Sequence, residues 1–281
     1  MSDMLVTFIS PAEINSDLGV VNAARVSLNK RSQWDTTHKP ECEVDCTRLG
    51  NCDTSHFHDT LSIADAKLIS YLAKNSHWTP FAHSRLYFEI DWMGFATLEE
   101  LHFYKNFNSA GFAWIDDGRY TYIKGSVYAW LSALQHMPLA MAEMVHCCSY
   151  AHYPISTAAL TKDRELEPFS YSSHTVVTSE DFITQQTQRE PQFYKLLTAT
   201  MLVTVPVSVA HQMREPTIGI VYSDIVTQDH QQTAFYMTAT LHRWSQWLSL
   251  RLDSHVQQET QEIAGMIRDS LSSNYPQFCI Q

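Results

Sequence analysis

The chain of 281 residues lacks the features that mark several broad classes of protein. It has no run of about 18 apolar residues, so we predict no membrane-spanning helix. Its first residues, MSDMLVTFIS, lack a basic stretch followed by a long apolar one, so we expect no signal peptide. Positive charge is scarce, with 19 Lys and Arg against 30 Asp and Glu. The resulting net charge of −11 argues against a protein that binds nucleic acid through bulk electrostatics.

Cysteine is present but lies in no paired CxxC motif. Six cysteines in a chain without an export signal predict reduced thiols and a cytoplasmic protein. A polar stretch holds three of them with two histidines: Cys42, Cys46, Cys52, His56 and His58. Thiolate and imidazole are zinc ligands, and an irregular loop would gain stability from a structural zinc ion. The alternative is a solvated loop with incidental thiols.

Length and a hydrophobic content of 44% predict one domain, residues 1–281, with a sizeable core. The polar, aperiodic residues at 30–60 and 150–192 predict two insertions into that domain, the second as loop or insertion. Strand-like and helix-like patterns are mixed along the rest of the chain. We therefore predict the α+β class.

Periodicity and turn residues give the individual elements. We predict strands at 4–9 and 84–91, helices at 20–27, 61–75 and 126–147, turns at 17–19 and 116–118, and apolar segments at 193–213 and 218–226 that fit strand or helix. The longest helix is predicted at 234–268, where apolar residues recur three or four apart without a proline. On that helix Arg251 and His255 would share a face and grip an anionic planar ligand.

Three stretches resemble motifs of the flavin-dependent thymidylate synthases, in the family's order. Residues 249–257, SLRLDSHVQ, followed by Glu259, resemble the family's signature helix. Residues 22–27, NAARVS, resemble its N-terminal AARVS segment. Residues 67–72, KLISYL, and 77–83, HWTPFAH, resemble its "LI-YL … H-TPFEH" segment.

The resemblance implies a mixed core with a long central helix, assembled as a homotetramer with active sites between subunits. It implies FAD-dependent reductive methylation of a pyrimidine deoxynucleotide, dUMP to dTMP, with methylenetetrahydrofolate and NADPH as co-substrates. In that chemistry Arg251 would contact and activate the pyrimidine. A fixed guanidinium suits this role because it stabilises negative charge on the ring through two donors.

The resemblance also implies cofactor-binding residues, some of them altered. The candidates for the flavin are His77, Thr79, Thr240, His242 and Gln246. Thr240 and His242 stand where the family has Asn-x-Arg, so we expect weaker contacts to flavin phosphates. Proline 80 should bias Thr79 to an extended conformation that presents it to a ligand.

The family's Arg-His-Arg motif is not intact, and two stretches fit as its remnant. Residues 102–120 end in Arg119 and Tyr120, and we prefer them because they follow the strand at 84–91 directly. Residues 209–224 contain Arg214 and resemble the lead-in to the motif. On the preferred register the candidates for substrate binding are Arg119, Tyr120, Arg214, Arg251 and His255.

Two other functions remain open because of these losses. The alternatives to the leading interpretation are a paralogue that makes a hydroxymethylated pyrimidine nucleotide from dUMP or dCMP, and a non-catalytic nucleotide-binding subunit. A cysteine nucleophile, as in the non-flavin thymidylate synthases, has no supporting motif here. The aromatic residues between 87 and 130 fit a core or a subunit interface better than a stacking site.

Overall fold

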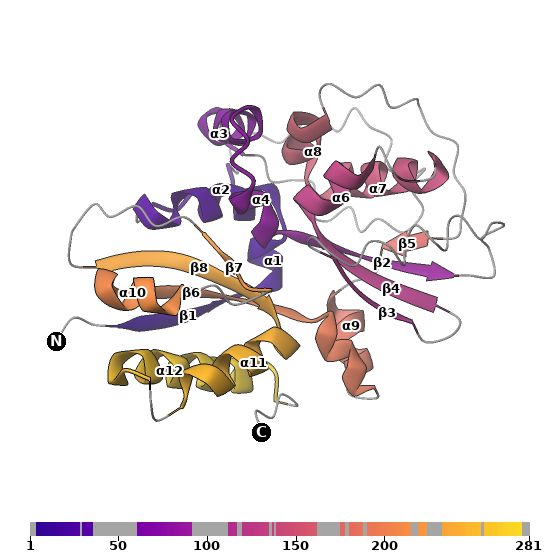
Figure 1. Ribbon diagram of the computed structural model, residues 1–281. Coiled ribbons are helices and arrows are strands. Elements are labelled where there is room, and N and C mark those ends of the chain that lie inside the picture. The colour runs from indigo at the N-terminus through magenta and orange to yellow at the C-terminus, as the bar shows by residue number, and fades with distance from the viewer. Residues whose placement is uncertain are drawn as a thin grey trace.

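The computed structural model describes residues 4–28, 30–35, 61–91, 112–116, 120–134, 137, 139–161, 175–177, 180–187, 190–214, 219–223, 232–253 and 256–276. These residues form two antiparallel four-stranded sheets with helices packed against them (Figure 1). The predicted α+β class is confirmed at this level.

The central sheet has the strand order β1-β6-β8-β7. Its strands are β1 (Leu5–Ile9), β6 (Thr198–Pro206), β8 (Gln232–Thr240) and β7 (Val221–Tyr222). β6 and β8 pair along nine residues, with Met201 opposite Met237. β6 is rich in threonine and valine, and β8 in threonine with two aromatic residues, which suit a pleated surface.

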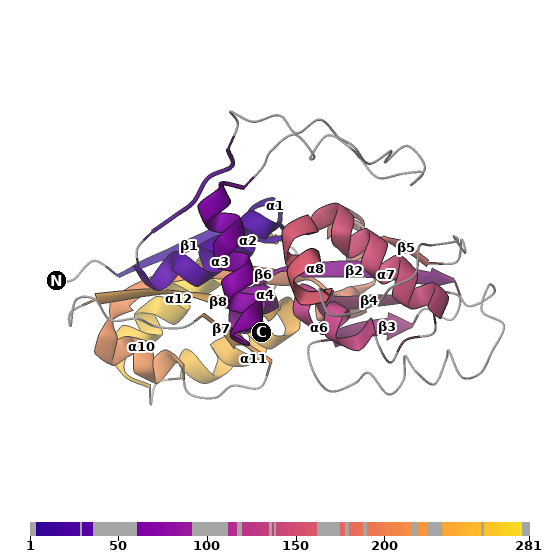
Figure 2. The same ribbon diagram turned by 90° about the horizontal axis from the view of Figure 1, so that it is seen from above.

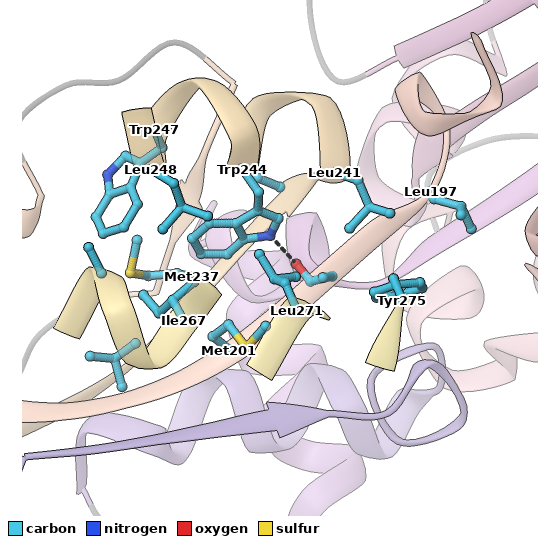
Figure 3. Packing of buried hydrophobic residues seen from close by; sticks show 14 of the residues in the cluster. Leu197, Met201, Met237, Leu241, Trp244, Trp247, Leu248, Ile267, Leu271 and Tyr275 are labelled. Carbon is cyan, nitrogen blue, oxygen red and sulfur yellow. Dashed lines mark hydrogen bonds between the residues drawn. The ribbon is translucent and has the colours of Figure 1, made fainter. Parts of the chain in front are cut away.

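Two helices cover one face of this sheet: α11 (Leu241–Arg251) and α12 (Gln258–Asn274). Between them and the strands lies a dry core of fully buried side chains, including Trp244, Trp247 and Leu271 (Figure 3). The indole N–H of Trp244 donates to the carbonyl oxygen of Ala199 at 3.1 Å, which fixes α11 to β6.

Helices from the first part of the chain cover the opposite face (Figures 1 and 2). They are α1 (Pro11–Ile14), α2 (Asp17–Arg25), the 3-10 turn η1 (Val26–Leu28), α3 (Ile63–Lys74) and α4 (Thr79–His83). The Ser16 hydroxyl accepts from the Gly19 N–H at 3.1 Å and caps α2. Arg25 of α2 and Asp65 of α3 form an ion pair of 2.7 Å, so these two helices are joined.

The second sheet has the order β3-β4-β2-β5. Its strands are β3 (Phe112–Asp116), β4 (Tyr120–Ser126), β2 (Arg85–Asp91) and β5 (Thr175–Val177). The accompanying helices are α6 (Val127–Ala133), α7 (Leu139–His152), α8 (Pro154–Thr161), α9 (Glu180–Thr187) and the 3-10 turn η6 (Pro191–Lys195). Helix α10 (Val207–Met213) belongs to the central sheet, where it packs against β6, β8 and α12. The Trp130 ring meets Phe88 and Phe112 edge-on, each at 4.7 Å between centroids, so this core is aromatic.

The prediction of one long helix over 234–268 is wrong. Residues 232–240 form β8, and the remainder divides into α11 and α12. The apolar residues spaced three or four apart do lie mainly in α11 and α12, but the pattern was extended too far towards the N-terminus. Residues 235–240 of β8 are all buried, which hides the two-residue alternation of a strand. A shared helical face for Arg251 and His255 therefore no longer follows.

Smaller predictions are corrected in the same way. Residues 17–19 are the first turn of α2, not an isolated turn, because Ser16 caps them. The segment 150–192, expected as loop or insertion, is not simply loop, because it contains the end of α7 together with α8, β5 and α9. That it is an insertion stays a prediction. Thr79 is helical, since Pro80 lies in the first turn of α4, where proline is well tolerated.

Other predictions are confirmed. The strands at 4–9 and 84–91 are β1 and β2, and the helix at 61–75 is α3. The helical segment 126–147 appears as α6 and α7. No helix in the described part of the chain is both long and apolar enough to cross a membrane.

Candidate functional site

Two of the predicted flavin-binding residues, His77 and Thr79, line one pocket. Its other lining residues are Ala23, Ala24, Leu72, Pro80 and Ser223. The pocket therefore collects residues from the NAARVS, KLISYL and HWTPFAH stretches at the edge of the central sheet. Its volume of about 50 Å³ is far below the several hundred Å³ of a usual cofactor site. The pocket is therefore too small to enclose a flavin ring.

An aromatic pair stands beside this pocket. The rings of Tyr71 and His77 are stacked, with centroids 6.2 Å apart and planes 17° from parallel. Tyr71 is 57% exposed, which is unusual for so large a side chain and leaves its outer ring face accessible. The backbone N–H of His77 donates to the carbonyl oxygen of Leu72 at 2.9 Å, and this hydrogen bond holds His77 against the end of α3.

A buried polar chain runs from α4 into the central sheet. His83 Nδ1 lies 2.9 Å from Thr238 Oγ1, which lies 2.8 Å from Thr200 Oγ1. Arg85 donates from Nη2 to Thr200 Oγ1 at 3.0 Å and to the His83 carbonyl oxygen at 2.8 Å. All four residues are buried, so the chain fixes α4 and β2 to the central sheet.

Burial sets the protonation of this cluster. Desolvation, together with the positive charge of Arg85, lowers the pKa of His83 to about 3, so its imidazole is neutral at physiological pH. Desolvation also raises the pKa of Tyr236, whose ring meets His83 edge-on at 5.9 Å, to about 12. His83 is the last residue of α4, two residues before β2 begins.

The other flavin candidates lie at the start of α11. Thr240 is the N-cap, and its hydroxyl accepts from the Arg243 N–H at 3.3 Å. Gln246 accepts from Arg243 Nη1 at 2.8 Å, and its Nε2 lies 3.2 Å from His242 Nε2. Thus Gln246 joins His242 and Arg243 into one hydrogen-bonded group at the start of the helix.

Arg251, the predicted catalytic residue, ends α11 and is half-buried. Its guanidinium carbon lies 6.0 Å from the centre of the Trp247 ring. α11 and α4 cover opposite faces of the central sheet (Figure 1), so Arg251 does not share a pocket with Thr79 in one chain. Arg214 follows α10 and lies over the Tyr222 ring at 5.8 Å.

Several predicted residues fall outside the described residues: Arg119, His255, Cys42, Cys46, Cys52, His56 and His58. Tyr120 begins β4 in the second sheet, opposite Asp91. Among the described residues, no group of three His, Cys, Asp or Glu side chains could hold a metal ion. The zinc prediction concerns residues that the structure does not describe, and it stays a prediction.

Comparisons with models of protein families, with curated proteins and with solved structures found no match. The resemblance to flavin-dependent thymidylate synthases consequently rests on the three stretches of sequence.

Sequence reasoning missed Ser223, Arg85, Thr200 and Thr238. Ser223 is buried, and its hydroxyl accepts from the Tyr236 N–H at 2.8 Å while the residue lines the pocket. The sequence did carry a signal for the threonines, because Thr198 and Thr200 in β6, and Thr238 and Thr240 in β8, are two residues apart. Polar residues at alternate positions of a buried strand indicate a polar face.

Proposed function

We propose that the protein is a divergent flavin-dependent thymidylate synthase, which transfers a one-carbon unit reductively to C5 of a pyrimidine deoxynucleotide. The observation that carries the proposal is that two of the three resembling stretches, residues 22–27 and the stretch formed by 67–72 and 77–83, line one pocket, whereas residues 249–257 do not. Residues 67–72 and 77–83 are neighbours in the chain, but residues 22–27 are far from them in sequence and meet them only in the fold. Their convergence is expected if they build one site.

The chain's own residues would bind and orient the reactants. His77, Thr79 and the exposed ring of Tyr71 offer an imidazole, a hydroxyl and an aromatic face to a flavin ring. Bound flavin would supply the redox chemistry. Arg251 would hold the pyrimidine, and the ring of Trp247 beside it keeps the guanidinium in place.

The position of Arg251 supports assembly of the site from more than one copy of the chain. Thr79 belongs to α4 and Arg251 to α11, on opposite faces of the central sheet. A pocket of about 50 Å³ also needs a further wall to enclose a flavin. We therefore propose that a homotetramer, as the resemblance implies, combines the α4 side of one subunit with the α11 side of another.

A non-catalytic nucleotide-binding subunit is the second candidate. The small pocket and the replacement of the expected Arg by His242 favour it, because few fixed cations remain for phosphates. Hydroxymethylation of dUMP or dCMP stays a variant of the first proposal.

The first experiment is an absorbance spectrum of the purified protein with and without added FAD, repeated with dUMP. We expect a bound-flavin peak that shifts when dUMP is added. His77→Ala should weaken flavin binding, whereas His152→Ala, an exposed position at the end of α7, should not. No flavin binding by the wild-type protein would favour the non-catalytic subunit.

A second experiment identifies the product. The protein is incubated with FAD, NADPH, methylenetetrahydrofolate and either dUMP or dCMP, and the nucleotides are weighed by mass spectrometry. We expect added methyl on dUMP, lost in Arg251→Gln but kept in Arg268→Gln, whose exposed side chain pairs with Asp269 on α12. Unmodified nucleotide with both substrates would contradict either catalytic proposal.

A further inference from the structure

The buried chain at His83 contains an unpartnered polar atom. His83 is fully buried, and no atom of the described residues forms a hydrogen bond with its Nε2. Its other ring nitrogen is bound to Thr238 at 2.9 Å. A buried nitrogen without a partner costs about 1–3 kcal/mol, so it needs an explanation.

The hydrogen bonds of the chain decide which ring nitrogen carries the proton. Arg85 is only a donor, so Thr200 Oγ1 accepts from it. If Thr200 then donates to Thr238, and Thr238 to His83 Nδ1, every hydroxyl proton has an acceptor. The reverse direction would leave the Thr200 hydroxyl proton without an acceptor as well as Nε2 without a donor. The first arrangement leaves a single unsatisfied group, the Nε2–H of His83.

The surroundings of His83 connect it to the pocket. Thr79 lies four residues earlier on α4, on the same face of the helix, and lines the pocket. Tyr236 meets the His83 ring edge-on and is bonded through its backbone to Ser223, another lining residue. Ala23, a third lining residue, packs in the same apolar cluster as Tyr236. His83 is not itself a lining residue, but it packs among residues that line the pocket or contact its lining.

We propose that His83 Nε2–H is a donor reserved for one oxygen acceptor at the inner end of this pocket. The acceptor is an ordered water molecule in the protein alone, or a carbonyl oxygen of a ligand that reaches the pocket's end. The face of the Tyr236 ring is a much weaker acceptor and does not replace an oxygen. This role is separate from the flavin wall formed by His77 and Thr79.

Nuclear magnetic resonance of the full chain, with nitrogen-15 in the histidine rings, tests the proposal directly. The signals of His83 are identified by their loss in His83→Gln. We expect Nδ1 to be unprotonated and Nε2 protonated at neutral pH, with cross-peaks from Nε2–H to a bound water. Protonated Nδ1 would overturn the proposal. So would an Nε2–H that shows neither contact with water nor any response to added FAD or dUMP.

Ligand addition and variants of His83 and Thr238 distinguish a ligand carbonyl oxygen from a water oxygen as the acceptor. If a ligand carbonyl reaches His83, adding FAD or dUMP moves the Nε2–H signal, and His83→Phe weakens binding of that ligand about tenfold. If the acceptor is water alone, the water cross-peak persists with ligand present, and affinity is unchanged. Thr238→Val, which removes the hydroxyl at Nδ1 and leaves the ring in place, should let the proton move to Nδ1. Failure of FAD to bind would count against the proposed function only, because the tautomer and the water contact are measured without it.

Discussion

Alternate residues of β6 and β8 build the two faces of the central sheet, yet one face is apolar and the other is polar. Met201, Val203 and Met237 face α11 and α12 in a dry apolar core. Thr200 and Thr238, their neighbours along the strands, face α4 and bind a buried arginine and histidine. The dry face supplies stability, whereas the polar face supplies directional contacts that position the pocket. Residues that lower packing efficiency are tolerated where they position a site.

The largest expected effect lies on the dry face. Trp244→Ala should lower the free energy of unfolding by about 3–5 kcal/mol, because it empties a fully buried indole site. Urea unfolding followed by circular dichroism measures the loss. Trp244→Phe, which keeps a ring but removes the donor to Ala199, should cost less. Equal costs for the two variants would mean that the hydrogen bond, and not packing, dominates this face.

The polar face should make stability depend on pH. Between pH 6.5 and about 3, the unfolded chain carries a proton on His83 that the native protein does not. Unfolding is therefore favoured as the pH falls, by about 2 kcal/mol between pH 6.5 and 5. Urea unfolding of wild type and His83→Gln at several pH values isolates this contribution. Parallel curves for the two proteins would show that His83 titrates normally.

Opposite changes of polarity should both destabilise the protein. Thr200→Val leaves the Arg85 donor without its acceptor, and Val203→Thr places a hydroxyl in the dry core. Each should cost about 1.5 kcal/mol, although the side chains have nearly the same shape. Thermal unfolding of the two single variants gives the comparison. A stabilising Thr200→Val would mean that the polar chain is dispensable for folding.

The smallest changes in stability are expected at two glycines outside the core of the central sheet. Gly219 has φ of +90°, and an added Cβ would lie 2.9 Å from Arg243 Nε, so Gly219→Ala should cost about 1 kcal/mol. Gly265 lies within α12 with nothing within 4 Å of an added Cβ, so Gly265→Ala should stabilise by a similar amount. Melting temperatures should move in opposite directions. If both variants shifted the melting temperature in the same direction, the positive φ of Gly219 could not be the reason for its effect.

Short elements with unbroken patterns were predictable from sequence. The strand at 84–91 and the helix at 61–75 each follow one period and appear as β2 and α3. β8 was mistaken for the start of a helix because its neighbours bury both of its faces. The pairing of His77 with Thr79 was predictable from their closeness in sequence, whereas Ser223 enters their pocket only through the pairing of β7 with β8.

The sequence by itself determined the mixed α+β class, the local elements with clear periodicity, and the stretches that carry the resemblance. The tertiary structure decided which face of the sheet each stretch covers. It separated Arg251 from Thr79, and it joined Arg85, Thr200, Thr238 and His83 into one buried chain. The physical reason is that these contacts bridge between 38 and 155 residues of chain. Strand register and helix packing set such contacts, and neither is encoded in a local pattern.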